Sequence, residues 1–333
     1  MIELDGSILT FRFPHLGAEA AARISFHRTL RVPDTDVIHR LPAGLGWFPL
    51  KHVDDYADRL PASVVRRGGL IMPMWQAEAL WIGFHESWFE DRRMPCAVKI
   101  ATGKINAVSG ERWRDGLHRE PQDYCPVPLQ PWLDGFKTES DVVRQFVAMP
   151  LGAGVTAEEQ LTGAAEHGGL QLSVTPLTSD AYARWKEPLV WQEQASAQRL
   201  YSESPQLGLA PGGWIRQRVY ADDRPLADYD TSRTLRMFVT ILDAMAWRHV
   251  TGEAPPTEPP TAKEYAAAGI PWFDLYDSDV AAVPGVPALA AMQPVSLARM
   301  LGCTDEELEM EPHVVLDLLR RRHVKTVRGW TGD

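Results

Sequence analysis

Apolar and polar residues alternate along several short segments of the chain. In residues 22–32, apolar side chains occupy one side at a period of two, which predicts a half-buried β-strand. The N-terminal MIELDGSILTF predicts a β-hairpin that turns at Asp5-Gly6. A second hairpin turn is expected at Ala101-Thr-Gly-Lys104, between two apolar segments. Eight more short strands are predicted, at 70–72, 80–84, 96–101, 105–108, 142–149, 170–175, 214–220 and 234–241.

Helical signals are fewer and lie mostly toward the C-terminus. The sequence Thr156-Ala-Glu-Glu159 is a capping box that predicts a short helix, and residues 242–249 predict another. Capping boxes also begin at Thr261 and Thr304. A last helix is expected over 312–322. Its apolar stripe, expected to be buried, consists of Val315, Leu318 and Leu319. Its basic C-terminal end, expected to be exposed, consists of Arg320, Arg321 and Arg322.

These patterns predict an α+β fold with a β-rich body, either an antiparallel sandwich or a barrel-like sheet. We expect the body to span residues 1–252. Four prolines in residues 253–261 predict a stiff, extended connector, and residues 262–333 are expected to form a helical C-terminal appendage. The appendage is expected to pack on the body or on a second subunit.

Composition narrows the class of protein. The 333 residues are 45% hydrophobic and 23% charged, as is typical of a soluble globular protein. The net charge of −10 provides no basic excess for binding nucleic acid, and no apolar run is long enough to span a membrane. Glu3 and Asp5 stand where a signal peptide would be basic, and the cysteines Cys96, Cys125 and Cys303 form no disulfide framework. The chain is therefore expected in the cytoplasm.

The standard cofactor and metal motifs are not matched convincingly. Gly152, Gly154 and Ala157 fit a dinucleotide fingerprint, but the preceding strand carries polar residues and the following helix is expected to end at Gly163. No zinc-protease or calcium-loop spacing occurs, so neither a metal nor a cofactor is expected. Two remaining groups of charged residues are expected to face solvent: Lys99 and Lys104 on a strand face, and the acidic loop with Asp222, Asp223, Asp228 and Asp230.

The dipeptide Arg-Gln occurs in two predicted strands, as Arg144-Gln145 and as Arg216-Gln217. A period of two places each glutamine in an apolar row and each arginine on the opposite face. Two interpretations stay open. The glutamines can tie backbone groups together inside a sandwich, because a buried amide requires hydrogen-bond partners. Alternatively, the Arg-Gln pairs can face a cleft and bind a carboxylate or phosphate group of a ligand.

The stretch EPQDYCPVPLQPWLDGF, residues 120–136, contains four prolines and is expected to cross the surface as a rigid brace. A rigid loop positions reactive groups well, so this brace is expected to border a site. Its candidate acid–base groups are Asp123 and Tyr124, with Asp134 a weaker candidate.

Several phrases, among them GLGWFPLKHVDDYADRLP, VVRQFVAMPLGAGVTAEEQLTG and TAKEYAAAGIPWFDLYD, resemble a family of uncharacterised bacterial proteins with no established activity. The resemblance spans residues 40–280 and implies no catalytic residue, cofactor or partner.

Two functions from different classes are therefore expected as alternatives. The first is an enzyme or small-molecule binder that recognises a polar, anionic or sugar ligand on the β-rich body. The second is a non-catalytic structural protein that binds a protein partner or another copy of itself through the C-terminal helices.

Overall fold

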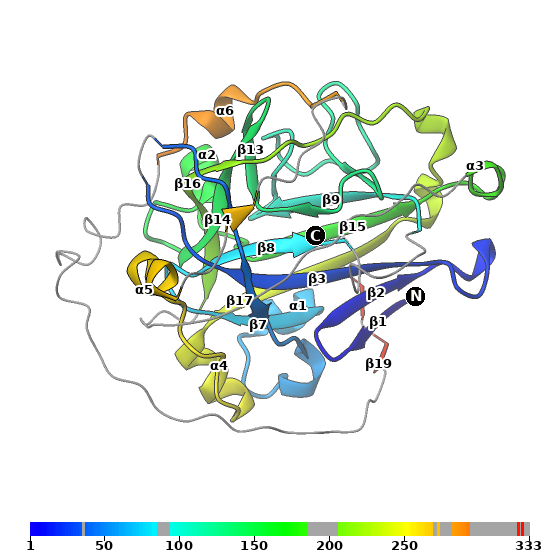
Figure 1. The fold of residues 1–333 in the computed structure, drawn as a ribbon. Helices are drawn as coiled ribbons and strands as arrows, with labels where there is room; N and C mark the ends of the chain where they lie inside the picture. The colour runs from blue at the N-terminus through cyan, green and yellow to red at the C-terminus, as the bar shows by residue number, and fades with distance from the viewer. Residues whose placement is uncertain are drawn as a thin grey trace.

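A computed structural model describes residues 1–34, 37–84, 94–185, 206–268, 272–273, 281–293, 325–326 and 328–329. Strands dominate this part of the chain, and the helices lie at their periphery (Figure 1). The longest strands are β3 (Ala21–Thr29), β14 (Val142–Pro150), β16 (Leu207–Arg216) and β17 (Leu235–Asp243). The β-rich α+β fold expected from the sequence is confirmed.

The strands form two hydrogen-bonded sets. The first set runs in the order β19 (Lys325–Thr326), β1 (Ile2–Asp5), β2 (Ile8–Arg12), β3, β8 (Ala79–Gly83), β14 and β16. The second set runs in the order β6 (Lys51–His52), β7 (Leu70–Met74), β17, β15 (Leu170–Pro176), β9 (Cys96–Thr102) and β11 (Cys125–Val127). The sets join where Leu207 pairs with Ile241. Among the described strands, only the β7–β17 pairing is parallel.

Shorter strands and helices complete the described structure. The other strands are β4 (Leu41–Pro42), β5 (Gly44–Trp47), β10 (Ile105–Asn106), β12 (Trp132–Leu133), β13 (Gly135–Glu139) and β18 (Trp272–Phe273). The α-helices are α1 (Ala62–Arg67), α2 (Ala157–Thr162), α3 (Ser179–Arg184), α4 (Ala244–Thr251), α5 (Ala262–Ala267) and α6 (Pro287–Ala290). The 3-10 turns are η1 (Pro14–Leu16), η2 (Val53–Tyr56), η3 (Leu226–Asp228) and η4 (Thr231–Arg233).

Local signals in the sequence place most elements correctly. The first hairpin turns at Gly6, which adopts a φ of 61°. The second turns at Gly103 and Lys104, both with positive φ, as a tight hairpin requires. The capping boxes at Thr156 and Thr261 begin α2 and α5 as expected. The Thr304 box and the 312–322 helix lie outside the described residues.

The strand predicted at 214–220 is misplaced, because β16 begins at Leu207 and ends at Arg216. The central Pro211-Gly-Gly213 of β16 is a sequence that disfavours a strand. The sequence pattern therefore predicted the strand only after these residues. The glycines are needed for close packing. A Cβ on Gly213 would lie 2.3 Å from the Pro33 carbonyl oxygen, and a Cβ on Gly212 would lie 2.5 Å from Val147 Cγ2.

Three buried glutamine side chains take the place of a neighbouring strand. Each donates to the carbonyl of one residue and accepts from the backbone N–H two residues later, as a strand partner would. Gln145 spans Leu30 and Val32, Gln130 spans Arg218 and Tyr220, and Gln122 spans Tyr220 and Asp222. On its other side, the 218–222 segment hydrogen-bonds residues 281–283.

The proline-rich connector lies against the body. Trp75 Nε1 donates to the Pro256 carbonyl at 2.9 Å, and the Arg28 guanidinium donates to the Thr257 carbonyl. Arg28 is itself held by the buried Glu78 carboxylate at 2.5 Å. Beyond the connector, the buried Tyr265 hydroxyl of α5 accepts a hydrogen bond from the Ala43 N–H. The division into body, connector and appendage stays a prediction.

Candidate functional site

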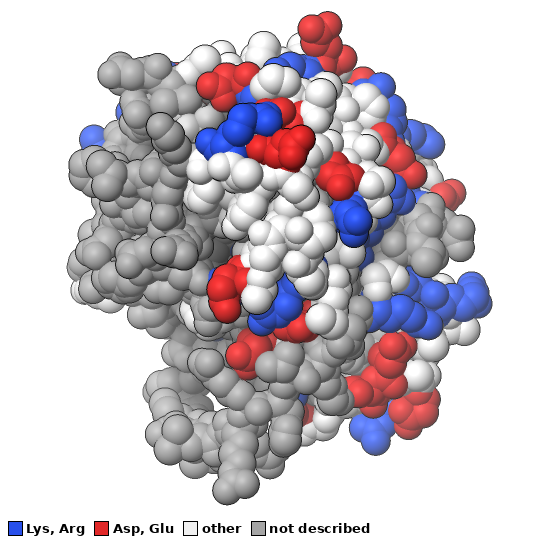
Figure 2. All heavy atoms as spheres, turned by 90° about the vertical axis from the view of Figure 1, so that its right-hand side faces the viewer, with Lys and Arg blue, Asp and Glu red and all other residues white. Residues whose placement is uncertain are grey.

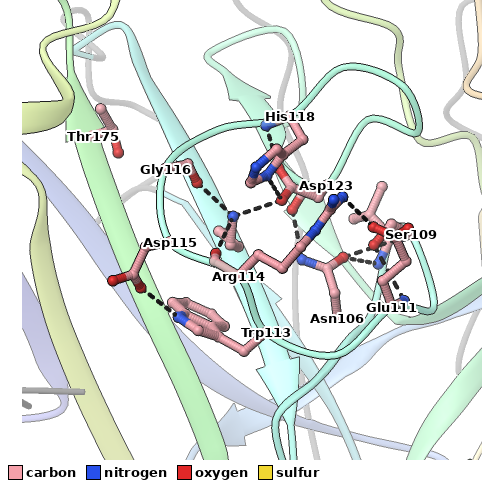
Figure 3. A network of polar contacts seen from close by, with 12 residues as sticks. Asn106, Ser109, Glu111, Trp113, Arg114, Asp115, Gly116, His118, Asp123 and Thr175 are labelled. Atoms are coloured by element: carbon pink, nitrogen blue, oxygen red, sulfur yellow. Dashed lines mark hydrogen bonds and ion pairs between the residues drawn. The ribbon is translucent and has the colours of Figure 1, made fainter.

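The strand β9 forms the floor of a polar cluster. All seven of its residues are buried, including Lys99, whose side chain is only 1% exposed. The expectation that Lys99 faces solvent is therefore wrong. The reason is the loop that joins β10 to β11, residues 107–124, which covers this strand (Figure 3).

The Lys99 ammonium group has three acceptors. It donates to Asp123 Oδ2 at 2.6 Å, to the Arg114 carbonyl at 2.9 Å and to the Gly116 carbonyl at 2.5 Å (Figure 3). The Trp113 ring lies 5.4 Å from Nζ. Burial lowers the pKa of Lys99, and the neighbouring Asp123 opposes that shift. Three protons on nitrogen match three acceptors, so Lys99 fixes the loop backbone on the strand.

Asp123 lies between Lys99 and His118. Its Oδ1 accepts from the His118 backbone N–H at 3.0 Å, and its Oδ2 lies 2.8 Å from His118 Nδ1. Because a carboxylate only accepts, the imidazole proton resides on Nδ1, which leaves the Nε2 lone pair of a neutral ring as an acceptor. The His118 side chain is 32% exposed, and no described residue hydrogen-bonds Nε2. The arrangement orients the imidazole and leaves the His118 side chain partly exposed.

Asn106 holds the backbone of Asp123, and it is the only asparagine in the chain. Its Nδ2 donates to the Asp123 carbonyl at 2.7 Å. Its Oδ1 accepts from the backbone N–H groups of Val108 and Ser109, each at 2.8 Å. This one side chain therefore connects the start of the loop to its end (Figure 3).

Tyr124, the neighbour of Asp123, belongs to a separate cluster around Asp222. Asp222 Oδ2 accepts from the hydroxyl groups of Tyr124 at 2.7 Å and Tyr229 at 2.9 Å, and from Arg119 at 3.1 Å. The Asp222 side chain is only 2% exposed, so the expectation of a solvated loop is wrong for this residue. Two tyrosines and an arginine compensate for the burial of its charge.

The other candidate residues fall into different surroundings. Gln217 is buried and hydrogen-bonds Asp134, whereas Gln145 hydrogen-bonds the backbone near the end of β3. Arg144 is buried with its guanidinium 3.9 Å from the Trp214 ring, and Arg216 is exposed. In the β14–β16 register, Arg144 pairs with Trp214 and Val142 with Arg216. The structure thus brings Asp134 to Gln217, and it places Asp123 with neither arginine of the Arg-Gln pairs.

The glycine-rich turn after β14 holds a carboxylate of the protein itself. The backbone N–H groups of Gly152, Gly154 and Thr156 all donate to the Glu159 side chain. These are the groups that would cradle a phosphate in a nucleotide-binding loop. The helix α2 ends at Thr162 and Gly163 is its C-cap, so the helix stops where the sequence predicted.

Sequence reasoning missed Lys99, His118 and Asn106, although weak signals exist. The chain has 27 arginines and only seven lysines, so a lysine within an apolar strand is unusual for this protein. His118 stands five residues before Asp123, and Asn106 is unique. No motif connects the three positions, because the fold of the 107–124 loop brings them together.

Among the described residues on the face that includes α3, acidic and basic side chains lie beside one another (Figure 2). Within the described residues, no group of His, Cys, Asp and Glu side chains has a geometry suited to a metal ion. None of the described helices is long and apolar enough to cross a membrane.

Comparisons of the chain with protein-family models, with curated proteins and with solved structures find no match.

Proposed function

We propose that the protein is an enzyme that acts on a small polar or anionic molecule at the 107–124 loop, with His118 as the group that transfers a proton. The observation that carries this proposal is the 2.8 Å contact between His118 Nδ1 and the buried Asp123 carboxylate. An aspartate that fixes one imidazole nitrogen makes the other nitrogen a directed base.

The surroundings support a polar ligand. Lys99 neutralises Asp123, so the pair adds no net charge that would repel an anion. Arg114 and Arg236 contribute partly exposed guanidinium groups, which hold the exposed side chains of Glu111 and Asp115. A carboxylate or phosphate of a ligand can replace either acidic partner.

A substrate panel tests this proposal. Chromogenic esters, phosphate monoesters and glycosides are assayed with the wild-type protein and with His118→Gln. We expect turnover of one class to fall by roughly 10²–10⁴-fold, as is typical when a general acid–base group is lost. His249→Gln is the matched control, because His249 is exposed and lies on α4. Equal turnover in the wild type and His118→Gln would reject the role of His118.

A ligand screen covers the case of a binder without catalysis. Anionic metabolites and sugars are tested for a rise in melting temperature. A ligand at 100 times its Kd adds about 2.7 kcal/mol of stability. The rise is expected to shrink in His118→Gln and to persist in His249→Gln.

We also propose a cytoplasmic location and membership of the bacterial family that the sequence resembles. The free, buried thiols of Cys96 and Cys125 support a reducing compartment. Fractionation of the native cell checks the location. The alternative function is a structural protein that docks through C-terminal helices. Of these helices, α5 and α6 are described, whereas the helix expected over 312–322 lies outside the described residues.

A further inference from the structure

The loop that carries His118 folds back on itself. Arg119 and Gln122 form an isolated antiparallel bridge, and the Asp123 N–H donates to the His118 carbonyl at 3.1 Å. His118 and Asp123 therefore lie opposite each other at the base of a short turn. Arg119 and Tyr124 are their immediate neighbours in sequence, one on each arm of the turn.

These two neighbours meet at a carboxylate from another part of the chain. Arg119 Nη2 lies 3.1 Å from Asp222 Oδ2 and 3.2 Å from the Tyr124 hydroxyl, and the Tyr124 hydroxyl donates to the same Oδ2 at 2.7 Å. Arg119 also donates to the Arg224 carbonyl. One buried oxygen thus holds both arms of the turn.

Asp222 is itself held firmly. Its backbone N–H donates to Gln122 Oε1 at 2.9 Å, its Oδ1 accepts from the Arg224 N–H at 3.2 Å, and Tyr229 donates to Oδ2 from outside the turn. Since the carboxylate is buried, it is stable only when its donors are in place. The position of Asp222 is therefore coupled to the conformation of the turn.

We infer that Asp222 is a positioning residue for His118: through Arg119 and Tyr124 it sets the spacing of the two arms and hence the contact between His118 and Asp123, an inference that rests on the proposed function of His118. The alternation along the turn supports this. Asp123 contacts Lys99 on the strand floor and His118 contacts Asp123, whereas Arg119 and Tyr124 reach the 222–229 segment.

Two matched tyrosine variants separate positioning from general stability. Tyr124→Phe and Tyr229→Phe each remove one hydroxyl that donates to Asp222, at 2.7 and 2.9 Å. Only Tyr124 lies in the turn that carries His118. The direct readout is the low-field proton NMR resonance of His118 Nδ1–H, assigned by its absence in His118→Gln. This resonance reports the hydrogen bond to Asp123 without any substrate.

We expect Tyr124→Phe and Asp222→Asn to shift or broaden the resonance, and Tyr229→Phe to leave it in place. Turnover of the substrate class found with the panel is expected to fall by up to about 10²-fold in the first two variants, because small misplacements of a catalytic group are costly. Asp228→Asn is the control for Asp222→Asn, since Asp228 lies in the same segment and pairs only at the surface with Arg184.

The outcomes distinguish this inference from the function on which it rests. An unchanged resonance in Asp222→Asn, or an equal response in Tyr124→Phe and Tyr229→Phe, overturns the positioning role. If Asp222→Asn does not fold, the two tyrosine variants decide alone. If the resonance responds as expected but His118→Gln keeps full turnover, Asp222 positions the imidazole and the proposed function is rejected.

Discussion

Gln217 and Asp134 hydrogen-bond each other twice. The Asp134 N–H donates to Gln217 Oε1 and Gln217 Nε2 donates to Asp134 Oδ2, both at 2.7 Å. Trp132 Nε1 donates to the same carboxyl oxygen at 2.7 Å. Two residues that the sequence suggested for ligand binding thus satisfy each other inside the protein, with no cation among these contacts to balance the carboxylate.

Burial raises the pKa of Asp134 to about 7, from 3.8. The folded protein therefore favours the protonated acid. The contribution of Asp134 to stability is fully present below pH 3.8 and is lost as the pH rises through about 7. Asp134→Asn mimics the neutral acid, so its stability relative to the wild type is expected to increase between those limits, by at most about 1.4 kcal/mol per pH unit. Urea unfolding across this pH range measures the effect. Asp54→Asn, at an exposed ion pair, is the control.

The Lys99–Asp123 pair is expected to matter far more than a surface pair of the same length. Lys99→Met leaves a buried carboxylate uncompensated and is expected to cost about 3–5 kcal/mol in the free energy of unfolding. Lys51→Met breaks a pair with Glu253 that is also 2.6 Å long but partly exposed, and should cost about 0–1 kcal/mol. Equal losses in urea unfolding would contradict a role for burial.

Gln145 allows a similar comparison among glutamines. Gln145→Leu leaves the Leu30 carbonyl and the Val32 N–H without partners in the interior, at an expected cost of about 1–3 kcal/mol for each group. Gln160 also hydrogen-bonds a backbone carbonyl and a backbone N–H, both of Gln293, but at the surface. Gln160→Leu is therefore expected to change stability by about 0.5 kcal/mol or less. Differential scanning calorimetry of the two variants measures this difference in stability.

The buried pair Arg28–Glu78 is expected to keep the connector on the body. In Arg28→Met, Glu78 loses its cation and Thr257 loses a donor, so residues 253–261 should detach and be cleaved faster in limited proteolysis. The surface variant Arg12→Met, which breaks a pair with Glu3, serves as the control. Unchanged cleavage in Arg28→Met would show that other contacts hold the connector.

The fold class and most strands could be predicted because local pattern decides them. The turn at Gly103-Lys104 and the capping box at Thr156 depend on a few neighbouring residues. The strand β16 escaped prediction because Pro211 and its glycines serve contacts with distant segments, which a local pattern does not record.

The candidate site could be predicted only in part. Asp123 was identified from a proline-rich stretch that was expected to cross the surface as a brace, but β11 and β12 in that stretch are buried and pair with β9 and β8. The burial of Asp123 between Lys99 and His118 depends on how the 107–124 loop covers β9. Polar residues whose partners lie on other segments resemble solvent-exposed residues when only the sequence is read. Lys99 and Asp222 were both misjudged for this reason.

The glutamine side chains that replace a strand partner also have a kinetic consequence. The amide protons of Val32, Tyr220 and Asp222 are held by Gln145, Gln130 and Gln122, respectively. Each can exchange with solvent only when its glutamine swings away, which exposes buried polar groups on both sides. These loop positions should therefore exchange as slowly as the centre of a sheet, and the slowest opening of the protein should include segments that have no strand beside them.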